Sequence, residues 1–160
     1  MSSDSPRELA LMKPAGARAR GVRLRGLLVL APCWGLLAAA AMLTPRASGY
    51  GTHRQLDLPA CSILARTGYP CPNCGLTTSV SAMAHGRVLA ALAAQPFGVV
   101  LALAMLVLGG AGARELAAGR PAIPALRVGW WWVWGAAAGM FGGWAIKLAV
   151  GLSRGELPVR

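Results

Sequence analysis

The residues with the clearest chemistry in this chain are three cysteines that lie close together in the sequence. Cys61 precedes the pair Cys71 and Cys74, and Gly75 follows the pair directly. Thiolates bind thiophilic metals, form disulfides and attack disulfides as nucleophiles. The spacing therefore predicts one local unit built from Cys61, Cys71 and Cys74. It leaves these three kinds of chemistry open, and also a fourth role in which reduced cysteines pack against the helices.

The first kind of chemistry is metal binding. A Cys-Pro-x-Cys-Gly segment is typical of a zinc knuckle, in which the glycine permits a tight turn that directs both sulfurs at one ion. Cys61 would be the third ligand, and His53 or a partner subunit would supply the fourth. His85 is expected outside the unit, because a helix running from Pro72 would carry it about 16 Å beyond Cys74. The sequence requires no cofactor. If the cysteines bind a metal, zinc is the expected one.

The other two kinds of chemistry need no metal. A disulfide between Cys61 and either Cys71 or Cys74 would close a short loop and stabilise it by about 2–3 kcal/mol, and the sequence favours this structural role. Thiol–disulfide exchange is the third alternative, since a cysteine at a helix amino terminus is favoured as thiolate. Enzymes of that kind carry the pair after a strand in a βαβ unit, and no such pattern is visible in this sequence.

Three uncharged apolar runs, 27–43, 88–113 and 128–146, must position these cysteines. Even the shortest run covers about 25 Å as a helix, which is close to the thickness of a bilayer core. With 56% hydrophobic and 13% charged residues, the composition excludes an ordinary soluble domain. The sequence predicts an all-α integral membrane protein with the lipid bilayer as its partner. The three transmembrane helices are expected at about 27–44, 96–113 and 128–147.

The segments around these helices divide the chain further. Residues 1–26 are expected to form a disordered basic tail, 27–150 the membrane domain, and 151–160 a second tail. The cysteine loop and an interfacial amphipathic helix fill 45–95. Because proline suits the first position of a helix, this interfacial helix is expected to begin at Pro72 with Cys71 as its cap. Gln95-Pro96 should interrupt the following apolar run and leave a short helix over 88–94.

Charge predicts the orientation. The net charge is +11, but the basic residues flank the apolar runs and do not alternate with aromatic residues, which argues against a nucleic-acid partner. The cluster from Arg18 to Arg25 precedes the first span, so the amino terminus is predicted to be cytoplasmic and the cysteine loop extracytoplasmic.

The third span carries glycines at a helical repeat, Gly135, Gly139 and Gly143. Small residues at this spacing form a groove in which another helix can approach closely. Packing within the chain is expected to fill the groove, and a homo-oligomer or a membrane-protein partner is the alternative. Lys147, near the end of the same span, is expected to extend toward the outer head groups.

The region from Cys61 to Gly98 resembles an uncharacterised family of small bacterial membrane proteins. That family is identified by a Cys-Pro-x-Cys-Gly-Leu-Thr-Arg motif, followed by a glycine and by an Asn-Pro pair that enters a helix. This sequence departs from the pattern at Thr78, where the family has arginine, and at Gln95, where it has asparagine. The resemblance implies a multi-pass protein of the bacterial cytoplasmic (inner) membrane with important cysteines, and it implies no activity.

No catalytic constellation accompanies the cysteines, so the protein is not expected to be an enzyme. The few acidic residues are expected outside the spans, which argues against a carboxylate-driven transporter. The sequence therefore predicts a small scaffold or accessory subunit with a structural, cysteine-rich extracytoplasmic loop. A zinc-binding or thiol-redox membrane protein that uses Cys61, Cys71 and Cys74 is the alternative.

Overall fold

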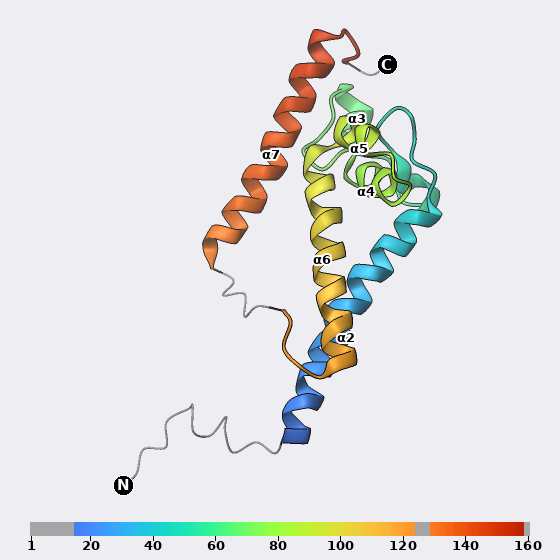
Figure 1. Ribbon diagram of the computed structural model, residues 1–160. Helices are drawn as coiled ribbons and strands as arrows, with labels where there is room; N and C mark the ends of the chain where they lie inside the picture. The colour runs from blue at the N-terminus through green and yellow to red at the C-terminus, as the bar shows by residue number, and fades with distance from the viewer. Residues whose placement is uncertain (1–14, 124–128, 159–160) are drawn as a thin grey trace. The chain divides into compact units, whose positions relative to one another are not determined.

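The computed structural model describes residues 15–123 and 129–158, and all of the regular structure in them is helical (Figure 1). The elements are α2 (Ala15–Met42), the 3-10 helix η1 (Thr52–Leu56), α3 (Ser62–Thr67), α4 (Leu76–Ala84), α5 (Val88–Ala94), α6 (Pro96–Ala118) and α7 (Trp130–Ser153). Over the described ranges no strand occurs, which confirms the predicted all-α class.

Three helices are long and apolar enough to cross a membrane, as predicted: Gly16–Met42, Pro96–Ala118 and Trp130–Ser153. All three extend beyond the predicted bounds, and α7 continues to Ser153, past the predicted end at 147. Helix α2 begins at Ala15, because the alanine, arginine and leucine residues before the apolar run also favour a helix; residues 1–14 of the expected tail lie outside the described part. Helix α6 continues to Ala118 and therefore contains Glu115, which lies beyond the predicted end of the second span at residue 113.

The described chain forms two compact units. The first unit comprises residues 15–34 and 106–123, and the second comprises 35–105 and 129–158. We call the second the cysteine unit, because it contains Cys61, Cys71 and Cys74.

In the first unit, α2 and α6 approach each other backbone to backbone at two glycines. A Cβ atom added to Gly26 would lie 2.7 Å from the carbonyl oxygen of Gly112, and one added to Gly112 would lie 2.8 Å from that of Gly26. Such distances leave no space for any side chain at either position. The sequence prediction placed its close helix contact at the glycines of the third span and missed this pair, which has no glycine repeat around it.

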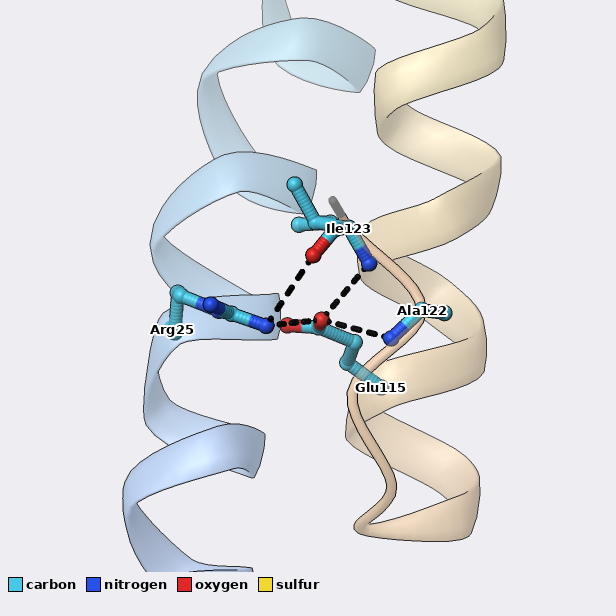
Figure 2. Close-up of polar contacts among 4 residues, drawn as sticks. All are labelled: Arg25, Glu115, Ala122 and Ile123. Atoms are coloured by element: carbon cyan, nitrogen blue, oxygen red, sulfur yellow. Dashed lines mark hydrogen bonds and ion pairs between the residues drawn. The ribbon is translucent and has the colours of Figure 1, made fainter. Parts of the chain in front are cut away.

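A buried carboxylate lies beside this crossing (Figure 2). The side chain of Glu115 in α6 is fully buried and forms an ion pair with Arg25 of α2, whose Nε donates to Oε2 at 3.0 Å. The backbone N–H groups of Ala122 and Ile123 donate to Glu115 Oε1, both at 2.8 Å. One carboxylate therefore joins α2, α6 and the loop that follows α6.

In the cysteine unit, α4 lies at the centre and packs against α5 and η1. Its middle residues, Thr78 to Ala82, are buried. Their hydroxyl groups are satisfied: Ser79 donates to the carbonyl of Gln95 at 2.9 Å and Ser81 donates to that of Leu43 at 2.7 Å. Small side chains that bond to neighbouring backbone allow close packing on several sides of this helix. Its predicted interfacial position stays a prediction.

The predicted start of this helix is also wrong. Helix α4 begins at Leu76 and not at Pro72, because Gly75 before it has φ 93°, a left-handed conformation that a continuing helix cannot contain. Cys71 and Cys74 therefore lie in a turn that precedes the helix and not on the helical face that was expected to carry them.

The predicted break at Gln95-Pro96 is confirmed. Helix α5 ends at Ala94, Gln95 is extended with φ −167°, and α6 begins at Pro96. The Gln95 side chain is fully buried, and its Nε2 donates to the carbonyl of Pro72 at 3.0 Å. The residue that separates the two helices thus also holds the cysteine turn.

The glycine repeat of α7 packs within the cysteine unit at two of its three positions. A Cβ atom on Gly139 would lie 2.9 Å from the ring of Phe97, and one on Gly143 would lie 3.4 Å from Gln95 Oε1. Gly135 has nothing within 4 Å. The groove is therefore contacted at Gly139 and Gly143 by Phe97 and Gln95. Self-association through the Gly135/Gly139/Gly143 face stays a prediction.

We expect the Gly139→Leu variant to melt at a lower temperature than the wild-type protein, because a leucine there overlaps the Phe97 ring. The matched control is Gly135→Leu in the same helix, where a side chain meets open space. Thermal melts in detergent measure both variants. Equal shifts at the two positions would show that the Phe97 contact contributes nothing.

Candidate thiol or metal centre

The three predicted cysteines meet in the structure. The Sγ atoms of Cys61 and Cys71 lie 3.6 Å apart, those of Cys71 and Cys74 lie 3.2 Å apart, and all three lie within 4.8 Å of one another. Cys61 comes from the residue before α3, whereas the other two come from the turn before α4. Two separate segments therefore supply one cluster of thiols, which we call the cysteine centre.

Local backbone geometry aims these sulfurs. The N–H of Cys74 donates to the carbonyl of Cys71 at 2.9 Å and closes a tight turn. Gly75 then reverses the chain in the left-handed region. A Cβ atom at Gly75 would collide with the carbonyl oxygens of Ala94 and Gly49 and with Lys147 Nζ, so only glycine fits at this position.

Three side chains hold the backbone of the turn from outside. Besides the Gln95 amide on Pro72, the indole Nε1 of Trp144 donates to the carbonyl of Pro70 at 2.7 Å, and Lys147 Nζ donates to that of Cys74 at 3.4 Å. The cysteine turn is thus fixed to α7 and to the start of α6.

Lys147 differs most from its predicted role. Its ammonium also donates to the carbonyl of Ala94 and lies 3.9 Å from the centre of the Tyr50 ring. The ammonium therefore contacts other residues of the cysteine unit. The sequence predicted instead that it would extend toward the outer head groups. Trp144 and Lys147 are three residues apart and so share one helical face, which is the signal that could have indicated a common contact.

The thiols of Cys61 and Cys74 differ in acidity. The backbone N–H groups of the first turn of α3, that of Leu64 above all, lower the pKa of Cys61. Burial raises the pKa of Cys74 to about 12. At any pH below that value, Cys61 therefore holds the larger thiolate fraction of the two.

We expect reduced, metal-free protein to be alkylated by iodoacetamide at Cys61 well before Cys74 at neutral pH, because the thiolate is the reactive form. Since the pKa of Cys61 is lowered, the alkylation rate of Cys61 should level off at a lower pH than the alkylation rate of Cys74. Peptide mass spectrometry after timed alkylation measures each site. Faster modification of Cys74 would contradict this assignment.

Neither histidine joins the cysteine centre. His53 was a predicted fourth ligand, but its Nε2 lies 3.1 Å from the carbonyl oxygen of Pro59. His85 lies outside, as expected, with its Nδ1 2.8 Å from the carbonyl oxygen of Ser81. Among the residues that the structure describes, the group contains no ligand besides the three cysteines.

The arrangement of sulfurs fits a thiophilic metal ion. Zinc–sulfur bonds of about 2.3 Å in a tetrahedral site place two sulfurs about 3.8 Å apart. The observed sulfur–sulfur distances of 3.6 and 3.2 Å are somewhat shorter than this value. Small side-chain rotations would bring the sulfurs to the distance that a zinc site requires. The three cysteines also line a cavity of about 700 Å³, together with Tyr50 and Asn73. A metal bound there would have three ligands from this chain, and a partner subunit or water would have to supply the fourth.

Comparison with known proteins adds a family but no activity. No curated protein and no solved structure matches the chain. The segment that does match a family model begins at Cys61 and contains the whole cysteine turn, α4, α5 and the first part of α6. Residues 61–109 match the family described as "Protein of unknown function (DUF2752)", and this confirms the resemblance to an uncharacterised family.

Proposed function

We propose that this chain is a multi-pass membrane protein that binds a thiophilic metal ion, zinc or one of similar preference, at Cys61, Cys71 and Cys74. The observation that carries the proposal is the meeting of three sulfurs from two segments within 4.8 Å. A single disulfide uses only two sulfurs, whereas a metal ion uses all three. The donor set of soft thiolates is the one that zinc and related metals prefer.

The role we propose for this centre is structural and not enzymatic. A metal at the cysteines would link the residue before α3 to the turn before α4, and the same turn is held by Trp144 and Lys147 of α7. The extramembrane segment would thereby become a fixed platform on the membrane helices. This arrangement supports a small scaffold or accessory subunit, as the sequence predicted.

A disulfide is the second candidate, and a specific distance favours it. Cys71 and Cys74 already have their Sγ atoms 3.2 Å apart, and Cys61 lies beside them. In an oxidising compartment, two of the three thiols would pair and stabilise the loop. A thiol-redox role would use the same pairs, with the more acidic Cys61 as the attacking thiol.

Metal content and thiol content together distinguish these candidates. We expect protein purified in detergent under reducing conditions to bind one zinc ion per chain, and to lose it on replacing Cys61, Cys71 or Cys74 by serine. Cys33→Ser is the matched control, since this fourth cysteine lies in α2. His53→Ala and His85→Ala should also retain the metal. If the wild-type protein bound no zinc, and if two thiols of protein prepared without reductant became titratable only after reduction, the disulfide would replace the metal.

The proposed location of the centre is extracytoplasmic in a bacterial inner membrane, and the support is the basic cluster before the apolar part of α2. We expect a membrane-impermeant maleimide to label Cys61 in intact spheroplasts, with Cys71, Cys74 and Cys33 replaced by serine. A single cysteine placed at Ala118, at the end of α6, should be labelled only after lysis. The reverse labelling pattern would show that the topology is inverted. It would leave the proposed metal site unaffected.

A further inference from the structure

A second cavity in the cysteine unit, of about 660 Å³, adjoins the cavity beside the three sulfurs and shares Arg46, Ser48, Tyr50 and Thr78 with it. It is enclosed by the loop from Pro45 to Tyr50, by α5 and by the last turns of α7. Neither Cys61, Cys71 nor Cys74 lines it. We call it the basic cavity, because arginine and lysine side chains line it.

Four cationic side chains line the basic cavity, against one carboxylate. The cations are Arg46, Arg87, Lys147 and Arg154, and the carboxylate is Glu156. Over the described residues, the one ion pair is that of Arg25 and Glu115 in the other unit, so none of these four cations has a carboxylate within bonding distance. The cavity therefore carries an excess of positive charge that its own residues do not neutralise.

Lys147 shows this excess most clearly, because it is partly buried and its partners are neutral. Its ammonium contacts the carbonyl oxygens of Ala94 and Cys74 and the ring of Tyr50. These groups hold the ammonium in place and leave its full charge uncompensated. A bound anion would supply the missing counter-charge.

The walls of the same cavity indicate which anion. Leu92, Ile146 and Val150 line it and are exposed. The last two belong to α7, a helix long and apolar enough to cross a membrane. A free inorganic anion would leave these apolar side chains unused, whereas a phospholipid would place its phosphate among the arginines and an acyl chain along α7.

We propose that the basic cavity binds the phosphate of an anionic phospholipid. Arg46, Arg87 and Arg154 contact the phosphate oxygens, since guanidinium groups match them in a bidentate manner. Lys147 contributes charge from the floor of the cavity and connects this site to the cysteine turn through its bond to Cys74. The bound lipid therefore stabilises the cysteine unit.

The test uses the full-length protein in mixed micelles, with phosphatidylglycerol added in steps to phosphatidylcholine and the melting temperature as the readout. We expect phosphatidylglycerol to raise the melting temperature of the wild-type protein. In Arg46→Gln/Arg154→Gln, the half-saturating mole fraction should rise about tenfold or more, which is the expected effect of losing charged contacts to phosphate. The matched control, Arg20→Gln/Arg66→Gln, removes two exposed arginines outside the cavity and should respond like wild type.

Equal responses of the two double variants would overturn the proposal, because the lipid effect would then reflect net charge alone. The melting temperature in phosphatidylcholine checks that each variant is folded, and Arg87→Gln serves as a second cavity variant if the first is not. Inorganic phosphate forms a separate arm, and we expect it to leave the melting temperature unchanged. Stabilisation by inorganic phosphate equal to that by phosphatidylglycerol would overturn the lipid as the source of the phosphate.

Discussion

The Gly75→Ala variant should lose the cysteine centre. The added methyl group would collide with the carbonyl oxygens of Ala94 and Gly49, and neither backbone can move without displacing its segment. An alanine also costs about 1–2 kcal/mol in the left-handed conformation that Gly75 adopts. We expect zinc affinity to fall as strongly as in Cys74→Ser, and the melting temperature to fall as well. Zinc titration and thermal melts of the same preparation measure the two effects.

Gly86→Ala is the matched control for this variant. Gly86 also has a left-handed backbone, with φ 70°, but a Cβ atom there meets nothing within 4 Å. The Gly86→Ala variant should therefore lose only the stability that an alanine costs in the left-handed conformation, and it should still bind zinc. If Gly75→Ala bound zinc as tightly as Gly86→Ala, the crowding around Gly75 would not be what shapes the turn.

The second large effect is expected at Glu115. Replacing it by alanine removes the partner of Arg25 and leaves the N–H groups of Ala122 and Ile123 without their acceptor. Removing Arg25 leaves the fully buried carboxylate of Glu115 without its counter-charge, which is strongly destabilising. The Arg25 side chain is 44% exposed, so Glu115→Ala costs stability mainly through the two N–H groups that lose their acceptor. We expect Glu115→Ala and Arg25→Ala each to lower the melting temperature, and the double variant to be less destabilised than the sum of the two.

Controls for this pair come from the same chain. Arg20→Ala removes an exposed arginine of α2, and Glu156→Ala removes an exposed carboxylate after α7. Neither residue forms an ion pair among the described residues, so both changes should be close to neutral. Additive losses at positions 25 and 115 would contradict the pairing shown in Figure 2.

The sequence predicted the parts of the fold that depend on local composition. Apolar runs identified the three long helices, and the restriction that Pro96 places on Gln95 located the break between α5 and α6. The grouping of the three cysteines followed from their spacing alone. The segment between Cys61 and the pair was expected to be loop, and the structure has α3 there, followed by a turn at Gly68.

The contacts that hold the cysteine turn could not be predicted in the same way. Trp144 and Lys147 are more than seventy residues from the turn in sequence, with separations of 74 and 73 to Pro70 and Cys74. A tryptophan and a lysine near the end of an apolar helix have an equally good alternative at the membrane surface, and the sequence contains nothing that distinguishes the two.

The prediction for the start of α4 failed for a different reason. Proline at the second position of the motif suits a helix start, and this local preference indicated Pro72. The structure has Gln95 donating to the carbonyl of that same proline, while the turn is closed by Cys71 and Cys74. Tertiary contacts therefore overrode the local preference and delayed the helix to Leu76.

The most direct test of the central claim is X-ray absorption at the zinc edge of the metal-loaded, full-length protein. We expect three sulfur neighbours at about 2.3 Å and one lighter neighbour, and a loss of sulfur neighbours in Cys61→Ser. A first shell of nitrogen and oxygen alone, or the same sulfur count in Cys61→Ser as in the wild type, would show that Cys61, Cys71 and Cys74 do not form one metal site.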